Sequence, residues 1–350
     1  MSINDFLKSG TIVSIGSGRL LIGYGARSWQ DAPESSCQDY FYFPDFFLTQ
    51  QKSFFFHEHT LELTFDELLQ MLPACECKKI EWSNNYRDLF YKTFTDLQRD
   101  FEQKRLKKAV PFVFETSSAV MNPEQLACSL KRALIYASSQ PVHVYGFWDA
   151  RAGILGATPE LLFKYRKEEA LILETMACAG TYRIQQGTAE QLLHDKKELE
   201  EHHLVVEGMM FSLLPLGVAI REKERVLSLP GLSHLVTPIQ VQLRSSATFS
   251  SIVQALHPTP ALGAVPKKEG RHWLSHYQTL IERHRFGAPV GYIRDYGQTA
   301  QCVVAIRNVQ WNEKGMALGA GCGIIPGSQV DSEWQEIQAK LETIKALLGL

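Results

Sequence analysis

The sequence has no strong charge imbalance. It holds 36 lysine and arginine residues against 38 aspartate and glutamate residues, which leaves a formal net charge of -2. A chain with so little net charge has no long-range field to attract nucleic acid or an anionic membrane. We therefore expect no nucleic-acid partner, and an anionic small molecule would have to be held by a few local cations.

Long apolar runs and processing signals are also missing. The most apolar stretch, residues 203–220, is interrupted by Glu207 and Pro215, so no window reaches the roughly 18 apolar residues of a membrane span. Residues 1–10 contain no basic stretch followed by an apolar run, so no signal peptide is expected. These absences predict a cytoplasmic protein without a membrane partner.

The cysteines show no metal-binding or disulfide pattern. They are odd in number and scattered, and the C-x-C pair of Cys75 and Cys77 has no partner ligands at matching spacing. Because cytoplasmic thiols are normally reduced, we expect seven ordinary thiols. They are Cys37, Cys75, Cys77, Cys128, Cys178, Cys302 and Cys322.

Common catalytic motifs are absent as well. Gly16 and Gly18 are not followed by a third glycine at dinucleotide-binding spacing, and His57 and His59 are too close together for a zinc-protease motif. The sequence also contains no Walker loop and no G-x-S-x-G element.

What is present predicts a large globular α+β protein. The composition is 45% hydrophobic and 21% charged, which is enough for a large core. Apolar runs predict strands over residues 11–15, 142–147, 171–173 and 302–306. A capping-box pattern opens one predicted helix, which runs from Thr188 to about Leu213, and a second is expected from Asp331 to about Leu347.

From residue 156 onward, nine segments in order resemble the chorismate-binding enzyme family. That family includes anthranilate synthase component I, aminodeoxychorismate synthase, salicylate synthase and isochorismate synthase. The segments are GATPELL (156–162), AGT (179–181), KELEEH (197–202), HLVTP (234–238), HPTPALG (257–263), GAPVGY (287–292), AIR (305–307), AGCGI (320–324) and EWQE (333–336), followed by Lys340.

The resemblance implies a fold and a domain plan. The expected fold is α+β, a large two-sheet β-sandwich core with helices packed outside. No repeat or linker divides the sequence, so residues 1–350 are expected to form a single domain. Within it, residues 1–100 are a divergent N-terminal part, and residues 101–350 are the catalytic part with the family motifs.

The resemblance also assigns catalytic and metal-binding roles. Glu160 is the expected general acid, and burial would raise its pKa; otherwise it is a solvated residue after a turn. Glu201 and Glu336 are the expected ligands of Mg²⁺, which commonly binds one or two protein carboxylates. By spacing alone they could instead form ordinary helix pairs with Lys197 and Lys340.

The remaining implied residues surround the substrate, chorismate. Arg307 and Lys340 are expected to hold a carboxylate, and the role of His234 near the substrate stays open. The other expected substrate-binding residues are Gly180, Thr181, Ala261 and Gly321.

Three positions distinguish branches of the family. Ala179 stands where common aminodeoxychorismate synthases have a nucleophilic lysine, and Ala261 resembles isochorismate synthases. Lys108 is the candidate for the water-activating lysine. Alternatively, Lys108 belongs to a solvated basic run with Lys104 and Lys107.

The leading hypothesis is a magnesium-dependent isochorismate synthase, an isomerase that needs no glutaminase subunit. Its product could enter menaquinone or siderophore biosynthesis. The alternatives are salicylate formation, an aminating synthase, or a non-catalytic chorismate-binding protein.

Overall fold

The computed structural model describes residues 1–33, 39–167, 171–183, 186–245 and 247–350. The helices are α1 (Ile3–Lys8), α2 (Phe65–Met71), α3 (Arg87–Glu102), α4 (Pro123–Ser139), α5 (Ala189–Leu192), α6 (Lys196–Leu213), α7 (Phe249–Leu256), α8 (Lys267–Leu280), the short 3-10 helix η1 (Asp295–Gly297) and α9 (Val330–Leu348). The strands are β1 (Gly10–Gly16), β2 (Arg19–Gln30), β3 (Tyr40–Tyr42), β4 (Phe54–Thr64), β5 (Lys108–Ala109), β6 (Phe112–Ser117), β7 (His143–Trp148), β8 (Gly153–Thr158), β9 (Leu161–Lys167), β10 (Leu171–Arg183), β11 (Gly217–Arg221), β12 (Arg225–Leu229), β13 (Leu232–Leu243), β14 (Ala264–Val265), β15 (Pro289–Arg294), β16 (Thr299–Val304), β17 (Asn308–Asn312) and β18 (Gly315–Gly321).

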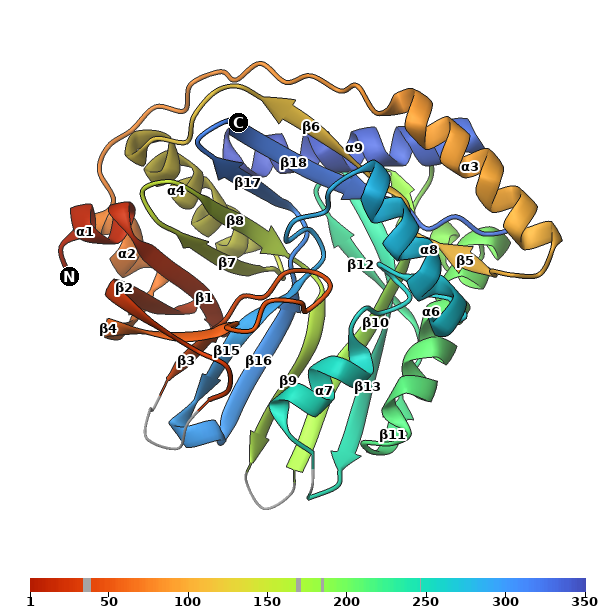
Figure 1. Cartoon of the computed structure of the whole chain (residues 1–350), viewed down its shortest axis with the longest axis horizontal. Helices are drawn as coiled ribbons and strands as arrows, with labels where there is room; N and C mark the ends of the chain where they lie inside the picture. Colours follow the sequence, from red (N-terminus) through yellow and green to blue (C-terminus); the bar gives the residue numbers. More distant parts are fainter. Residues whose placement is uncertain (34–38, 168–170, 184–185, 246) are drawn as a thin grey trace.

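Antiparallel pairing joins most strands into one ladder. Across the described residues, 15 strands follow the order β11-β13-β10-β9-β16-β15-β3-β4-β2-β1-β7-β8-β17-β18-β6, and the sixteenth, β12, pairs with β13 beside this path. The remaining pair, β5 and β14, forms a small separate sheet. The ladder is bent, as Figure 1 shows. One half contains β7, β8, β17 and β18, and the other contains β9, β10 and β13.

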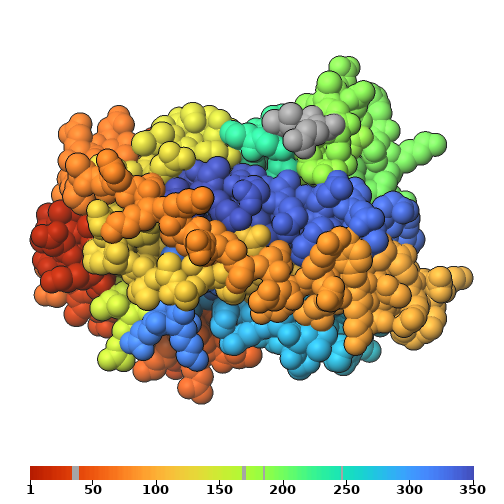
Figure 2. All heavy atoms as spheres, turned by 90° about the horizontal axis from the view of Figure 1, so that it is seen from above, coloured from red at the N-terminus to blue at the C-terminus, as the bar shows by residue number. Residues whose placement is uncertain are grey.

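The core lies both inside the bend and beneath the helices. A buried cluster joins Val13, Phe41, Phe55, Tyr145 and Val290 from strands of both halves of the ladder. Separate clusters lie where α4 and α9 cover one part of the sheet and where α6 and α7 cover another. Figure 2 shows α9 as a blue band bordered by the orange residues of α3. The predicted α+β class with helices packed outside is confirmed, but the expected two-sheet core is one bent ladder of 16 strands, whose halves enclose a shared buried cluster.

The first predicted helix is divided into two. Thr188 caps α5 through the expected capping box, but α5 ends at Leu192. A second cap, Asp195, then starts α6, because its side chain accepts a hydrogen bond from the Glu198 N–H at 3.0 Å. The predicted C-terminal helix is confirmed as α9, which ends at Leu348 and is capped by Gly349 in a left-handed conformation.

Two predicted strands have different limits. β10 continues to Arg183, so it carries residues 179–181 within a long central strand. β16 ends at Val304 instead of continuing to residue 306, and Arg307 lies in the connection to β17 with a φ of 56°. Strands do form over the expected residues 11–15 and over most of the expected 142–147, where β7 begins at His143. No helix in the described segments is long and apolar enough to cross a membrane.

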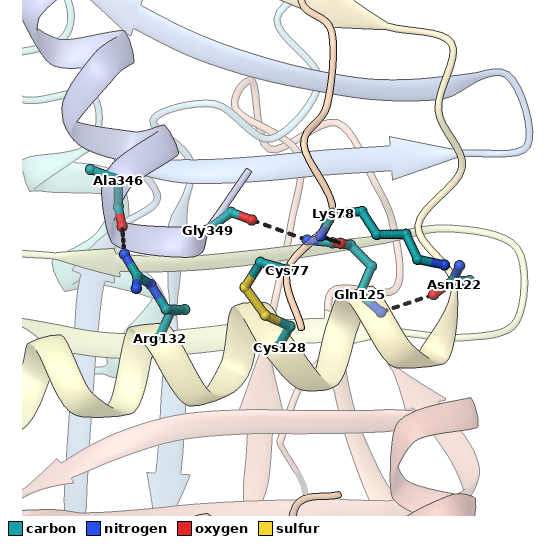
Figure 3. Close-up of a disulfide and its surroundings, with 8 residues drawn as sticks. All are labelled: Cys77, Lys78, Asn122, Gln125, Cys128, Arg132, Ala346 and Gly349. Atoms are coloured by element: carbon teal, nitrogen blue, oxygen red, sulfur yellow. Dashed lines mark hydrogen bonds between the residues drawn. A yellow bond between two sulfur atoms is a disulfide. The ribbon is translucent and has the colours of Figure 1, made fainter. Parts of the chain in front are cut away.

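The expectation of reduced thiols is wrong for two cysteines. Cys77 and Cys128 form a disulfide with their Cα atoms 5.7 Å apart (Figure 3). The segment after α2 runs along α4 at this point, and the Lys78 N–H donates to Gln125 Oε1 at 3.3 Å. The two cysteines are 51 positions apart, so their spacing in the sequence did not indicate that they pair. Cys75, Cys178, Cys302 and Cys322 remain thiols, and Cys37 lies outside the described residues.

Candidate active site

One cavity brings the predicted site residues together. It has an empty volume of about 680 Å³ and lies where β10 and β13 meet α6, α9 and the β16–β17 connection. Its lining includes Glu160, Gly180, Thr181, Glu201, His234, Ala261, Arg307, Gly321, Glu336 and Lys340. Lys108 contacts the lining residue Glu201, with its Nζ 3.4 Å from Glu201 Oε1.

Glu160 occupies the turn between β8 and β9. Its backbone is held on both sides, because its N–H donates to Thr158 Oγ1 at 3.2 Å and its carbonyl accepts from the Val304 N–H at 3.0 Å. The side chain is only 4% exposed. Burial raises the pKa of Glu160 to about 7, against the opposing influence of Lys108 and Lys340. A carboxyl group with this pKa can carry and release a proton near neutral pH.

Lys108 is not part of a solvated run. Lys104 and Lys107 are exposed, whereas Lys108 is fully buried in β5, opposite Val265 of β14. Its ammonium donates to the Pro260 carbonyl at 2.9 Å. Burial lowers the pKa of Lys108, although Glu201 pulls in the other direction. A buried lysine with a lowered pKa can act as a base.

Three glutamates from α6 and α9 surround the ammonium of Lys197. Lys197 Nζ lies 3.1 Å from Glu198, 3.4 Å from Glu201 and 2.8 Å from Glu333. Burial by itself would lower the pKa of Lys197. The negative charges of Glu201, Glu333 and Glu198, and to a smaller extent Glu336, outweigh burial and raise that pKa. Within the described part of the chain, no three such side chains already converge on one metal position.

This carboxylate cluster nevertheless fits a hard divalent cation. Its donors are all oxygen atoms, which Mg²⁺ prefers, and the lysine ammonium among them shows that the site accommodates positive charge. Burial would raise the pKa of Glu201, but Lys108, Lys197 and Lys340 outweigh it, and the net pKa is lowered. Glu201 is therefore held as a carboxylate, the form that binds metal.

The two helix pairs that the spacing offered as an alternative to metal binding are formed inside this cluster. Lys197 pairs with Glu201, and Lys340 Nζ lies 2.6 Å from Glu336 Oε1. Lys340 also donates to the Gly321 carbonyl at 2.8 Å, so its ammonium is fixed beside the cavity.

Arg307 enters the cavity as a buried cation. It is 6% exposed, and its Nη2 lies 3.2 Å from Nε2 of His234. Its Nη1 is buried without a hydrogen-bond partner among the described residues. Because an unpaired buried donor is costly, this atom is suited to an anionic ligand.

Gly323 leaves room for the charged pair at the cavity wall. A Cβ at this position would lie 1.9 Å from Glu201 Oε1 and 2.7 Å from Lys108 Nζ. No side chain larger than hydrogen fits here without moving Glu201. Glycine is required at position 180 for a different reason. Its φ is +80°, and a Cβ there would lie 2.8 Å from the Glu198 carbonyl oxygen.

Several residues of this site have no role that their local sequence predicts. Glu198 and Glu333 each precede a predicted ligand by three positions, so each shares a helix face with it, and that spacing was the available signal. His202 is fully buried and bridges the Ala179 carbonyl and Thr237 Oγ1, at 3.0 and 2.7 Å. No local pattern indicated the partners of His202.

Comparison with known proteins gives consistent matches. A sequence family described as "Chorismate binding enzyme" matches residues 51–349. The salicylate biosynthesis isochorismate synthase of Pseudomonas aeruginosa is 31% identical over 203 residues, which are 57% of this chain and 42% of that protein. Isochorismate synthase MenF of Bacillus subtilis is 32% identical over 238 residues, 65% of this chain and 48% of that protein.

The fold has a similar solved structure. The menaquinone-specific isochorismate synthase MenF from Escherichia coli superposes with a TM-score of 0.81 and 19% sequence identity, covering 99% of this chain and 91% of that one. The chain spans about half the length of the curated relatives it matches.

Proposed function

This chain belongs to the chorismate-binding enzyme family, and on that premise we propose that it is an isomerase that converts chorismate to isochorismate. The observation that carries the proposal is the pair of buried, oppositely perturbed groups at one cavity. Glu160 has a raised pKa, and Lys108 has a lowered one. Shifts in these two directions are those that a general acid and a general base require. The isochorismate synthases among its relatives support the same reaction.

The reaction exchanges one water for another across the ring. Neutral Lys108 takes a proton from a water whose oxygen bonds to ring carbon 2, and both ring double bonds shift, from C1–C2 to C1–C6 and from C5–C6 to C4–C5. The bond from carbon 4 to its hydroxyl breaks as Glu160 donates a proton, and the hydroxyl leaves as water. Lys108 ends protonated and Glu160 ends ionised, so proton transfer through solvent restores both groups.

Local cations hold the substrate carboxylates. Arg307 offers the unpartnered Nη1 described above, and Lys340 presents an ammonium already fixed by Glu336 and Gly321. Glu201 and Glu336 would hold Mg²⁺, with Glu198 and Glu333 beside them. When bound, the ion neutralises a substrate carboxylate that would otherwise face these glutamates.

Two alanines favour this reaction over amination. Ala179 lines the cavity where a lysine nucleophile would be required for aminodeoxychorismate formation. Ala261 lines the same cavity and matches the residue type of isochorismate synthases. The proposed reaction therefore uses water and needs neither ammonia nor a glutaminase subunit.

The direct test is incubation of the purified protein with chorismate and Mg²⁺, without ammonia, followed by chromatographic separation of products. We expect isochorismate, and we expect its formation to stop when EDTA is added. Activity that persists in EDTA would show that the reaction does not require Mg²⁺. Salicylate with pyruvate would assign a lyase, and turnover that depends on ammonia would assign an aminating enzyme.

A further inference from the structure

His234 lies between two cavity residues that come from different parts of the fold. It pairs with Thr181 across β13 and β10, next to an irregularity in the ladder at Gly180. Its ring contacts Thr181 Oγ1 through Nδ1 at 3.0 Å and Arg307 Nη2 through Nε2 at 3.2 Å. The side chain of His234 is 6% exposed, so both contacts are shielded from water.

These two contacts fix the position of the ring proton. Arginine has only donors and stays protonated in proteins, so His234 Nε2 must be the acceptor of the Arg307 hydrogen bond. A neutral imidazole then carries its proton on Nδ1 and donates it to Thr181 Oγ1. Burial lowers the pKa of His234 well below its usual value, and Arg307 and Lys340 lower it further. The ring is therefore held neutral beside the guanidinium.

The backbone of Arg307 is fixed independently of its side chain. Its φ of 56° is an uncommon conformation for a residue with a side chain. The neighbouring Ile306 carbonyl accepts a hydrogen bond from Tyr145 Oη at 2.7 Å, and Asn308 Nδ2 donates to the Ala305 carbonyl at 2.7 Å. Within the described residues, the Arg307 side chain makes its hydrogen bond to His234. His234 thus controls where the guanidinium points.

Thr181 is fixed by the same arrangement. Its N–H donates to Glu198 Oε2 at 2.8 Å, and its Oγ1 accepts from His234 Nδ1. The Thr181 hydroxyl hydrogen is therefore not used by His234 and is left to donate elsewhere. Because Thr181 lines the cavity, its hydroxyl is available as a donor to an oxygen bound there.

We infer that His234 is a positioning residue for substrate binding: as the neutral Nδ1–H tautomer it aims Arg307 at a substrate carboxylate and sets Thr181 as a second donor. This inference rests on the proposed function for the identity of the substrate. His234 thus acts through Arg307 and Thr181 and takes no direct part in the chemical step.

A double-mutant cycle on chorismate binding tests this role. Isothermal titration calorimetry would compare wild type, His234→Leu, Arg307→Met and the double variant, with thermal melting as a check on folding. We expect His234→Leu to weaken binding about tenfold, the size of a lost hydrogen bond to a charged group. In the Arg307→Met background, the same change should have little further effect.

The conservative variant His234→Gln is the matched control. Its amide offers one acceptor to Arg307 and one donor to Thr181, so it should restore most of the affinity that His234→Leu loses. Additive effects in the cycle, or no recovery with glutamine, would overturn the inference. If His234→Leu does not fold, the glutamine variant and the spectroscopic test below still decide.

The tautomer itself can be observed without substrate. Nitrogen-15 NMR of histidine-labelled protein, with His234→Gln used to assign the signal, should show a neutral ring protonated on Nδ1 at pH 7. A ring protonated on Nε2 cannot accept from Arg307 and would contradict the inference. Wild type that binds chorismate but yields another product would refute only the proposed reaction. Wild type that binds no chorismate would refute both.

Discussion

Glu160 can serve as an acid because the fold buries it. We predict that Glu160→Gln keeps the fold and Mg²⁺ binding but lowers turnover by about 10²–10⁴-fold, the usual contribution of a general acid. Because Glu160 must be protonated to act, kcat/KM of the wild type should fall as the pH rises through about 7. A chromatographic assay across pH would measure both effects. A variant with normal turnover would show that another group supplies the proton.

Lys108 has the complementary role. Lys108→Ala removes the proposed base, so hydration should be abolished while chorismate still binds, since Arg307 and Lys340 are untouched. The matched variant Lys107→Ala changes an exposed lysine one position away and should keep full activity. Calorimetry and the product assay separate binding from turnover. If Lys108→Ala kept its activity, Lys108 would not be the base, and its role would be structural.

Gly323 permits the contact between Glu201 and Lys108. We predict that Gly323→Ala displaces Glu201, because the added Cβ would lie 1.9 Å from its Oε1. The dependence of activity on Mg²⁺ concentration should shift to higher concentration or disappear. Gly327→Ala is the control, because its φ of +93° strains the backbone but no atom lies within 4 Å of the new Cβ. Equal metal responses in the two variants would argue against the contact.

At the scale of elements, the Cys77–Cys128 disulfide joins the segment after α2 to α4. Near it, Gln125 and Arg132 of α4 donate to the Gly349 and Ala346 carbonyls, so α4 also holds the end of α9 (Figure 3). Since α9 carries Glu336 and Lys340, this contact supports the active site from outside.

We predict that Cys128→Ser lowers the free energy of unfolding by about 2–4 kcal/mol, the usual effect of losing a disulfide. Chemical denaturation with and without a reductant would measure it, and the reductant should have no effect on the variant. Thiol labelling followed by mass spectrometry should find two more reactive cysteines after reduction. Equal labelling before and after reduction would show that the bond does not form.

At the scale of the molecule, the divergent N-terminal residues belong to the same ladder as the motif-bearing part. β1 pairs with β7, and β3 pairs with β15, so strands far apart in sequence share hydrogen bonds and one buried cluster. We propose that residues 1–350 form one cooperative unit, in agreement with the expected single domain.

This proposal predicts a single unfolding transition. Denaturation followed by tryptophan fluorescence and by far-ultraviolet circular dichroism should give coincident curves. The tryptophans lie in both parts, for example Trp29 in β2 and Trp311 in β17, so the fluorescence reports on the whole chain. An early transition confined to one probe would show that the first strands unfold separately.

The sequence by itself determined the features that depend on residue order. Capping residues start helices at their own positions, as Thr188 does, and the amphipathic pattern after Asp331 was enough to predict α9. The ordered segments after residue 156 identified the family, because each segment is a local string of residues. The same order placed Glu160 and Arg307 among the candidate residues before any contact was known.

The tertiary structure decided what depends on distant partners. The surroundings of Lys108 come from β14 and Glu201, so its burial was invisible in a sequence that looked like a basic run. His234 contacts Arg307, which is 73 positions away in the sequence. Cys77 forms its disulfide with Cys128, which is 51 positions away. Charge, proton position and pairing depend on these neighbours, because burial and nearby charges set the pKa of a group.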